Sequence, residues 1–204
     1  MSAEFRDGPT ARRDPEYVSA MEHFESMTHE QIYSGTETID AGEILQTSLT
    51  WLEAAATLTG SMPVTRSHAE HAIDAAGWQG PAAEAAAVSA RSLAASVDEL
   101  AAVFGEVGAR LGAVAGAAEA VKLAVPPPGD TGPVGAIARA LEAAHIIDAR
   151  IADEVMRQEA ILTMNMIYKP TYSAAGSGVP ALPALPDHPD AGPTTPQSRV
   201  GVVR

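Results

Sequence analysis

The longest regular pattern in this chain is an apolar stripe whose members are spaced alternately four and three residues apart. This heptad spacing is typical of a helix that commits one narrow face to another helix. It predicts a helix from about Pro81 to Ala124, with this stripe: Leu93, Val97, Leu100, Phe104, Val107, Leu111, Val114, Ala118 and Val121. Four glycines in the same stretch indicate either close helix approach or a weaker region: Gly105, Gly108, Gly112 and Gly116.

Apolar residues at helical spacing predict further helices on both sides of this one. The first runs from Pro15 to Met27, and residues 34–36 are interpreted as a break after it. The second begins after a cap at Thr38 or Asp40 and continues to residue 76. Within it, residues 60–63 contain a glycine and a proline, so this helix either kinks there or ends and restarts.

Two Gly/Pro segments bound the striped helix. Gly77-Trp78-Gln79-Gly80-Pro81 predicts a tight turn between two helices, with the proline in the first helical turn. Val125-Pro126-Pro127-Pro128 stops the helix, because prolines cannot continue it. A last helix is predicted from Pro133 or Val134 to Tyr168.

These elements predict an all-α fold: an elongated bundle of long antiparallel helices with a Trp-x-Gly hairpin turn. Residues 1–14 are interpreted as a flexible arm and 15–168 as the helical domain. Residues 169–204 are rich in Pro, Gly and Ala and lack an apolar period, so they predict a disordered tail.

Composition narrows the classes of function. The net charge of −13 argues against nucleic acid as a partner, and the absence of cysteine removes thiol chemistry. No signal peptide and no membrane span are expected, so these features alone predict a cytoplasmic chain; a leaderless export route would not be visible to them. The alanine-rich, aromatic-poor composition favours helices that approach closely.

Candidate catalytic chemistry is sparse. Glu142 and His145 have the Glu-x-x-His spacing of diiron bundles, and His68 and His71 share one helical face. A diiron site needs a second such pair and two more inward glutamates, which the sequence lacks. The prediction is therefore a protein that is not an enzyme and has no cofactor or metal, with a metal-binding helical-bundle enzyme as the less favoured alternative.

Four segments, in order, resemble the PPE domain of actinobacterial type VII (ESX) secretion substrates. Trp78-Gln79-Gly80-Pro81 is similar to the family's Trp-x-Gly-Pro turn, and Val125-Pro126-Pro127-Pro128 to its Val-Pro-Pro-Pro segment. Residues 135–141 resemble the start of its next helix, and Gln31-Ile32-Tyr33-Ser34-Gly35 its Met-Tyr-x-Gly segment. The resemblance covers residues 20 to 168; the N-terminal Pro-Pro-Glu of the family is absent, so the chain is PPE-like.

The resemblance implies a substrate that is cytoplasmic before export and then secreted or associated with the cell envelope. It implies helical pairing with a two-helix PE-like partner, an EspG-type chaperone, a type VII secretion ATPase, and membrane contact only through the secretion apparatus. The implied secretion motif is Trp78 with Gly80. A tyrosine motif at Tyr33 and Glu37 lies on the wrong side of the hairpin, which favours a partner that supplies that motif.

The implied partners are expected to bind at two surfaces. The stripe is either intrachain core or a partner seam, and we favour a seam made of Leu93, Val97, Leu100, Phe104, Val107, Leu111, Ile147, Ile151 and Val155. By resemblance, the tip away from the Trp turn binds the chaperone through Leu123, Val125, Val134 and Ile137. The alternative function is a self-assembling, EspB-like secreted structural protein.

Overall fold

The computed structural model describes residues 13–183, except 15–16, 19 and 129–132. Within these residues there is no strand, only an isolated antiparallel bridge between Arg13 and Pro180, so the all-α prediction is confirmed. The elements are a 3-10 turn, η1 (Phe24–Ser26), then α1 (His29–Glu37), α2 (Ala41–Ala75), α3 (Pro81–Ala124), α4 (Pro133–Ala143), α5 (Ala149–Thr163), a π-helix, η2 (Met164–Tyr168), and α6 (Lys169–Gly176).

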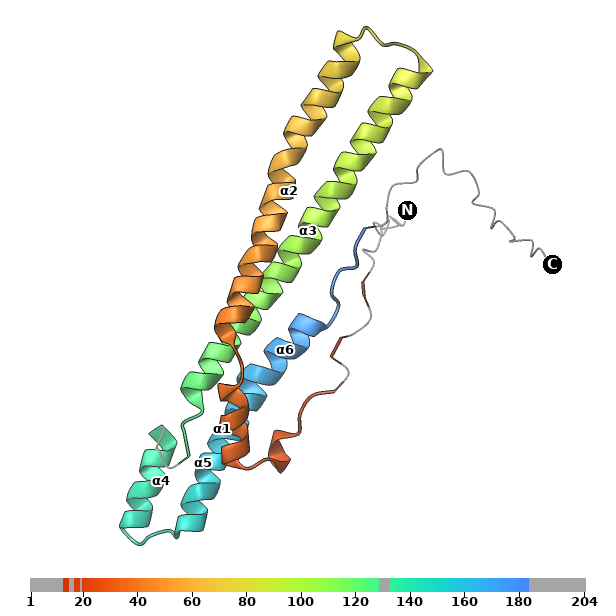
Figure 1. The fold of residues 1–204 in the computed structure, drawn as a ribbon. Helices are drawn as coiled ribbons and strands as arrows, with labels where there is room; N and C mark the ends of the chain where they lie inside the picture. Colours follow the sequence, from red (N-terminus) through yellow and green to blue (C-terminus); the bar gives the residue numbers. More distant parts are fainter. Residues whose placement is uncertain (1–12, 15–16, 19, 129–132, 184–204) are drawn as a thin grey trace, which may run out of the picture.

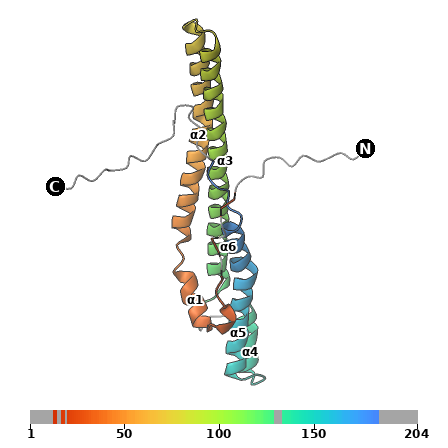
Figure 2. The ribbon, with the colours of Figure 1, turned by 90° about the vertical axis from the view of Figure 1, so that its right-hand side faces the viewer.

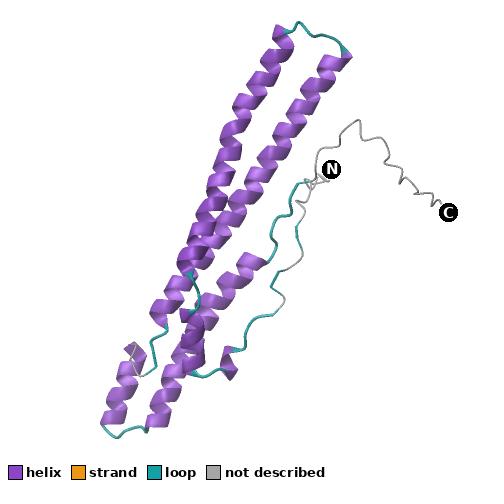
Figure 3. Cartoon of the chain, viewed as in Figure 1, coloured by secondary structure: helices purple, strands orange, loops and turns teal. Residues whose placement is uncertain are grey.

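The shape is a rod built on α2 and α3, which lie side by side and are joined by the loop at residues 76–80 (Figure 1). The helices α4 and α5 lie at the opposite end of the rod from this loop, and α6 lies against α3 (Figure 2). Colouring by secondary structure shows that loops connect the helices only at short segments, apart from the long N-terminal stretch before α1 (Figure 3).

The bounds of α3 are those predicted from the sequence. Gly80 caps its N-terminus with a φ of 94°, a conformation that favours glycine, and Pro81 occupies the first helical position. Val125 ends the helix in an extended conformation before the three prolines. At about 1.5 Å per residue, its 44 residues extend about 66 Å, which separates the two motif-bearing ends of the helix.

The helix α2 begins at the predicted cap and continues through the predicted interruption. The Asp40 carboxylate accepts a hydrogen bond from the Glu43 backbone N–H at 2.8 Å. Gly60 and Pro63 both lie inside the helix, which therefore does not end and restart between them. Packing against α3 along the rod stabilises this segment despite its weak helix formers.

A row of small residues on α3 faces α2, one position away from part of the predicted stripe. Its buried members recur every seven residues: Ala94, Ala101, Gly108 and Ala115. At Gly108 the helices approach so closely that the Ser48 hydroxyl donates a buried 2.7 Å hydrogen bond to the Gly108 carbonyl. The predicted stripe follows mainly large apolar side chains, so it does not include this row. Of the two predicted meanings of the glycines, close helix approach is the correct one at Gly108.

We expect the same substitution to have opposite effects at two glycines of α3. A Cβ on Gly108 would lie 2.8 Å from Leu52 Cγ and 3.1 Å from the Ser48 carbonyl oxygen, so Gly108→Ala should destabilise the protein by about 1–3 kcal/mol. Gly116 has nothing within 4 Å of that position, so Gly116→Ala should stabilise it by about 0.5–1 kcal/mol. Urea denaturation of both variants measures the difference, and a stabilised Gly108→Ala would contradict the close approach.

The N-terminal helix predicted over residues 15–27 is wrong. The described residues of this stretch form no α-helix, only one 3-10 turn at Phe24–Ser26. The first α-helix is α1 instead, and it includes residues 34–36, which were interpreted as a break. A capping box starts it: Gln31 N–H donates to the Thr28 hydroxyl, and Thr28 N–H donates to Gln31 Oε1 at 2.9 Å.

The single helix predicted from residue 133 to 168 is also wrong, because α4 and α5 are separated by a turn. His145 adopts a φ of 57°, and the N–H groups of His145 and Ile146 donate to the carbonyls of Glu142 and Leu141 in the pattern of a Schellman motif. Asp148 then caps α5 by accepting a hydrogen bond from Ile151 N–H at 2.9 Å. The turn lacks glycine and proline, which is why the sequence pattern did not show it.

Replacing this cap should weaken the end of the rod selectively. Asp148→Ala removes the acceptor for the Ile151 N–H, so we expect a loss of about 0.5–2 kcal/mol in the free energy of unfolding. Asp148→Asn retains a capping oxygen and should restore most of the loss. Hydrogen exchange of the first turn of α5 measures the effect, and equal exchange in the alanine variant and the parent would contradict the role of the cap.

The tail predicted to be disordered from residue 169 begins with ordered structure. The helix continues past Tyr168 through η2 into α6, and the backbone is described up to residue 183. The proline at position 170 is compatible with this helix because it lies within the first turn of α6. The remainder of the predicted tail, and residues 1–12 of the predicted arm, lie outside the described residues.

The main core lies where the rod meets the hairpin formed by α4 and α5, which we call the terminal hairpin. Residues from five helical elements and from the segment after α3 meet there: Phe24, Ile32, Val121, Val125, Ala160, Ile161 and Met164. Tyr168 packs its ring edge against Phe24, with ring centroids 5.5 Å apart. Burial and the nearby Glu22 carboxylate raise the pKa of Tyr168 to about 12, so its phenol stays neutral through the physiological range. This cluster ties α1, α3 and α5 into one unit.

Candidate interaction surfaces

The loop at the end of the rod presents Trp78. Gly77 has a φ of 60°, and the N–H groups of Gly77 and Trp78 donate to the carbonyls of Asp74 and Ile73, which completes a Schellman motif at the end of α2. Gly80 then caps α3. The Trp78 side chain is 47% exposed, so it is only partly used as an anchor within the chain and remains accessible on the loop.

The predicted stripe on α3, whose first six members belong to the predicted seam, becomes more buried with distance from this loop. Leu93 is 51% exposed, the next five members are half-buried, and Val114, Ala118 and Val121 are buried. The half-buried members are Val97, Leu100, Phe104, Val107 and Leu111. Phe104 packs edge-on against Trp51 of α2 at 4.8 Å between ring centroids. The stripe is therefore intrachain core at one end and accessible surface at the other.

Exposed leucines on α2 form a second apolar surface, beside the part of α3 around Gly108. Leu45, Leu49 and Leu52 are all exposed. They lie one helical turn apart along one face of the helix. Apolar side chains left exposed along one face of a helix are typical of a surface that contacts another protein.

The predicted seam residues of the terminal hairpin lie apart from those of α3. Ile151 and Val155 on α5, with Val134 on α4, line an open, mostly apolar groove of about 530 Å³. Ile147 lies in the turn that joins these two helices and is half-buried. The structure thus divides the predicted seam into two surfaces, at different places along the rod.

The four residues predicted to form the chaperone-binding tip differ in their exposure. Leu123 and Ile137 are 87% and 64% exposed, and Val134 lines the groove. Val125 is only 1% exposed and belongs to the core cluster, so it is not available to a chaperone and its assignment to the tip surface is corrected. Val125 ends α3 in an extended conformation, and sequence alone could not distinguish an inward from an outward valine there.

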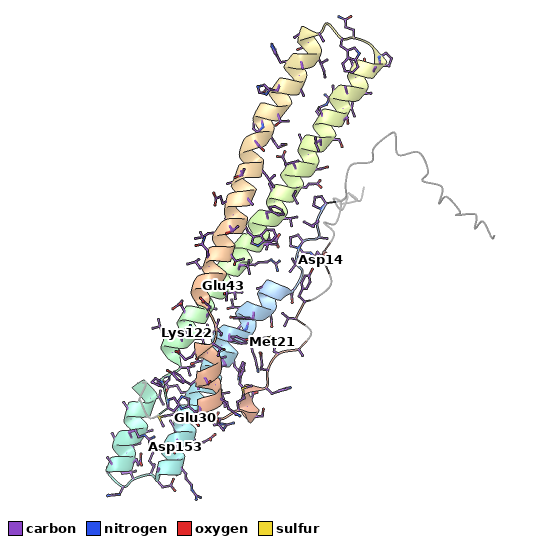
Figure 4. All side chains as sticks on the ribbon, in the orientation of Figure 1. Asp14, Met21, Glu30, Glu43, Lys122 and Asp153 are labelled. Atoms are coloured by element: carbon purple, nitrogen blue, oxygen red, sulfur yellow. The ribbon has the colours of Figure 1, made fainter. Side chains whose placement is uncertain are left out.

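Charged residues hold the terminal hairpin together beside the groove. Arg139 of α4 donates to Glu142 at 2.7 Å and, across the hairpin, to Asp153 of α5 at 2.8 Å. Figure 4 labels Asp153 at this end of the molecule. Glu154 lines the groove, and hydrogen bonds from Gln158 and Arg157 lower the pKa of its carboxyl group. The groove therefore combines an apolar floor with ionised groups along its rim, an arrangement suited to a protein contact.

The candidate tyrosine motif lies in α1. Tyr33 packs against the core cluster and is half-buried, whereas Glu37 is exposed in the last turn of the helix. The carbonyl of Tyr33 accepts a hydrogen bond from the Thr36 hydroxyl at 2.8 Å. The two members of the motif are thus one helical turn apart, and the tyrosine ring also has a packing role.

The candidate metal ligands do not form a cluster. Glu142 is engaged by Arg139, His145 forms the turn after α4, and His68 and His71 are exposed on α2. Among the described residues, no three His, Asp or Glu side chains are grouped closely enough to hold a metal ion.

By length and composition, α3 is the one described helix that could cross a membrane, although no span was expected from the sequence. The core helix of a protein that never enters a membrane passes the same test, so this is weak evidence.

No model of a known protein family matches this chain, and no curated protein matches it either.

Proposed function

We propose that this chain is a PPE-like substrate of a type VII (ESX) secretion system that acts through partner binding. The observation that carries the proposal is the placement of two motifs on one helix. The Trp-x-Gly-Pro turn begins α3, and the Val-Pro-Pro-Pro segment ends it, 44 residues later. Both resemble PPE-domain motifs in sequence and in order, and the half-exposed Trp78 is accessible for recognition.

Exposed apolar side chains at two places along the α2–α3 pair support pairing with a two-helix PE-like protein: one near the Trp78 loop and one near the start of α2. Leu93 and Val88 of α3 and Leu45 and Leu49 of α2 are exposed, although each is a large apolar side chain. A helix pair laid along α2 and α3 would bury such side chains and contribute about 25 cal/mol for each Å² of apolar surface removed from water.

The opposite end of the rod supports recognition by an EspG-type chaperone. Leu123 and Ile137 are exposed there, and the groove between α4 and α5 offers a further apolar surface. Because this end is separated from the Trp78 loop by the length of α3, a chaperone and a helical partner could bind the chain at the same time.

Co-expression tests the pairing. We expect the full chain, purified with a two-helix PE-like protein, to form a one-to-one complex that is more soluble than the chain alone. Leu93→Asp should disrupt this complex, whereas Arg91→Asp, two residues away and also exposed, should not. A chain that remains a monomer beside the partner would contradict the pairing, and one that assembles into a ring without the partner would favour the self-assembling, EspB-like alternative.

A further inference from the structure

One arginine of α3 holds the end of α6. The Arg110 side chain is 21% exposed, and Glu106, one turn earlier, accepts hydrogen bonds from its Nε and Nη2 at 3.1 and 2.6 Å. Its Nη1 and Nη2 also donate, at 2.7–3.2 Å, to four backbone carbonyls of the C-terminal segment: Ala174, Ala175, Ser177 and Gly178.

These carbonyls need such a donor. The last carbonyls of a helix have no partner within the helix, and a cation at the C-terminus also complements the helix dipole. The helix α6 has no buried residue, and the segment around its end consists of small side chains. No residue of α6 is fully buried, so the charge-assisted hydrogen bonds of Arg110 add to the partial burial that attaches this segment.

The N-terminal segment secures the same residues from the other side. Arg13 Nη1 donates to the Gly178 carbonyl at 2.6 Å, and the backbone N–H groups of Asp14 and Tyr17 donate to the carbonyls of Val179 and Gly176 at 2.9 and 3.2 Å. Figure 4 shows Asp14 on the segment that runs beside α3 and the end of α6.

Together these contacts lie over an apolar part of the rod. Tyr17, Val179 and Pro180 share the lining of a cavity of about 460 Å³ with Trp51 of α2 and Val107 of α3. Val107 belongs to the predicted partner seam. The C-terminal segment thus lies against the α2–α3 pair beside the half-buried part of the stripe.

We propose that residues 174–180 form a latch, fastened by Arg110, that covers the Trp51–Val107 face of the α2–α3 pair and exposes it when the latch opens. The role of this face in partner binding rests on the proposed function, and a partner that extends along the whole stripe would have to displace the latch. The latch itself is a property of the chain alone and is tested without any partner.

Tryptophan fluorescence of the full chain tests the latch. With Trp78→Phe as background, Trp51 is the only tryptophan, and acrylamide quenching reports its accessibility. We expect Arg110→Gln to increase this quenching and to accelerate hydrogen exchange at the Asp14 and Tyr17 amides at least about tenfold, because charged hydrogen bonds are lost. Arg91→Gln, an exposed arginine on the same helix, should change neither.

A second variant distinguishes opening of the latch from unfolding of the rod. Arg13→Gln removes one contact to Gly178 from an exposed side chain outside the helices, so it should open the latch in the same direction but less strongly. Circular dichroism confirms that helix content is retained. Unchanged quenching and exchange in both variants would overturn the latch, whereas failure to bind a PE-like protein would count against the proposed function and leave these results standing.

Discussion

Ile32→Ala should be the most destabilising single truncation that we predict, with a loss of about 2–5 kcal/mol in the free energy of unfolding. Ile32 is 2% exposed and lies in the core cluster that joins α1 to α3 and α5. Removing its side chain leaves a cavity within this cluster, which the surrounding helices cannot close without shifting. A loss of this size is a large fraction of the total stability of an ordinary domain.

Urea denaturation monitored by circular dichroism measures this loss. Ile137→Ala is the matched control, because the same side chain is exposed on α4, and it should change the free energy of unfolding by less than about 0.5 kcal/mol. Similar losses in the two variants would show that the core does not lie where the rod meets the terminal hairpin.

The helices whose ends are marked by strong local signals could be predicted from the sequence. Pro81 and the prolines from residue 126 mark both ends of α3, and the Asp40 cap marks the start of α2. The errors lie where the signal is a polar cap without glycine or proline. Thr28 and Asp148 start α1 and α5 by accepting backbone hydrogen bonds, and neither position stands out in an apolar pattern. A search for capping residues would have found both.

Tertiary contacts account for what else the sequence could not show. The segment after Tyr168 has the composition of a disordered tail, yet Arg110, more than sixty residues earlier in the chain, holds its carbonyls. Likewise, Val125 and Leu123 are both apolar residues at the end of α3, and only packing decides that the first is core and the second is surface. The sequence therefore predicted which residue types lie in the candidate surfaces, but not which of their side chains are accessible.

Trp78→Ala should abolish export while barely changing stability. A fully buried tryptophan costs about 3–5 kcal/mol when truncated, but Trp78 is half-exposed and its loop is held by backbone hydrogen bonds and two glycines with positive φ, so we expect a loss of about 1 kcal/mol or less. If the secretion machinery binds the exposed indole ring, removing the ring removes that contact and leaves the fold intact. The helix pair on either side of the loop would still form.

Export is measured as the ratio of secreted to cell-associated protein in an actinobacterial host with a type VII system, and stability by urea denaturation of the purified variant. Gln79→Ala is the matched control, because Gln79 is exposed in the same loop and is the variable position of the Trp-x-Gly motif; it should be exported like the parent. A Trp78→Ala variant that unfolds readily would make the ring an anchor for the hairpin. One that is stable and exported at the parental level would exclude Trp78 from the export signal, and the PPE-like proposal would lose its principal residue.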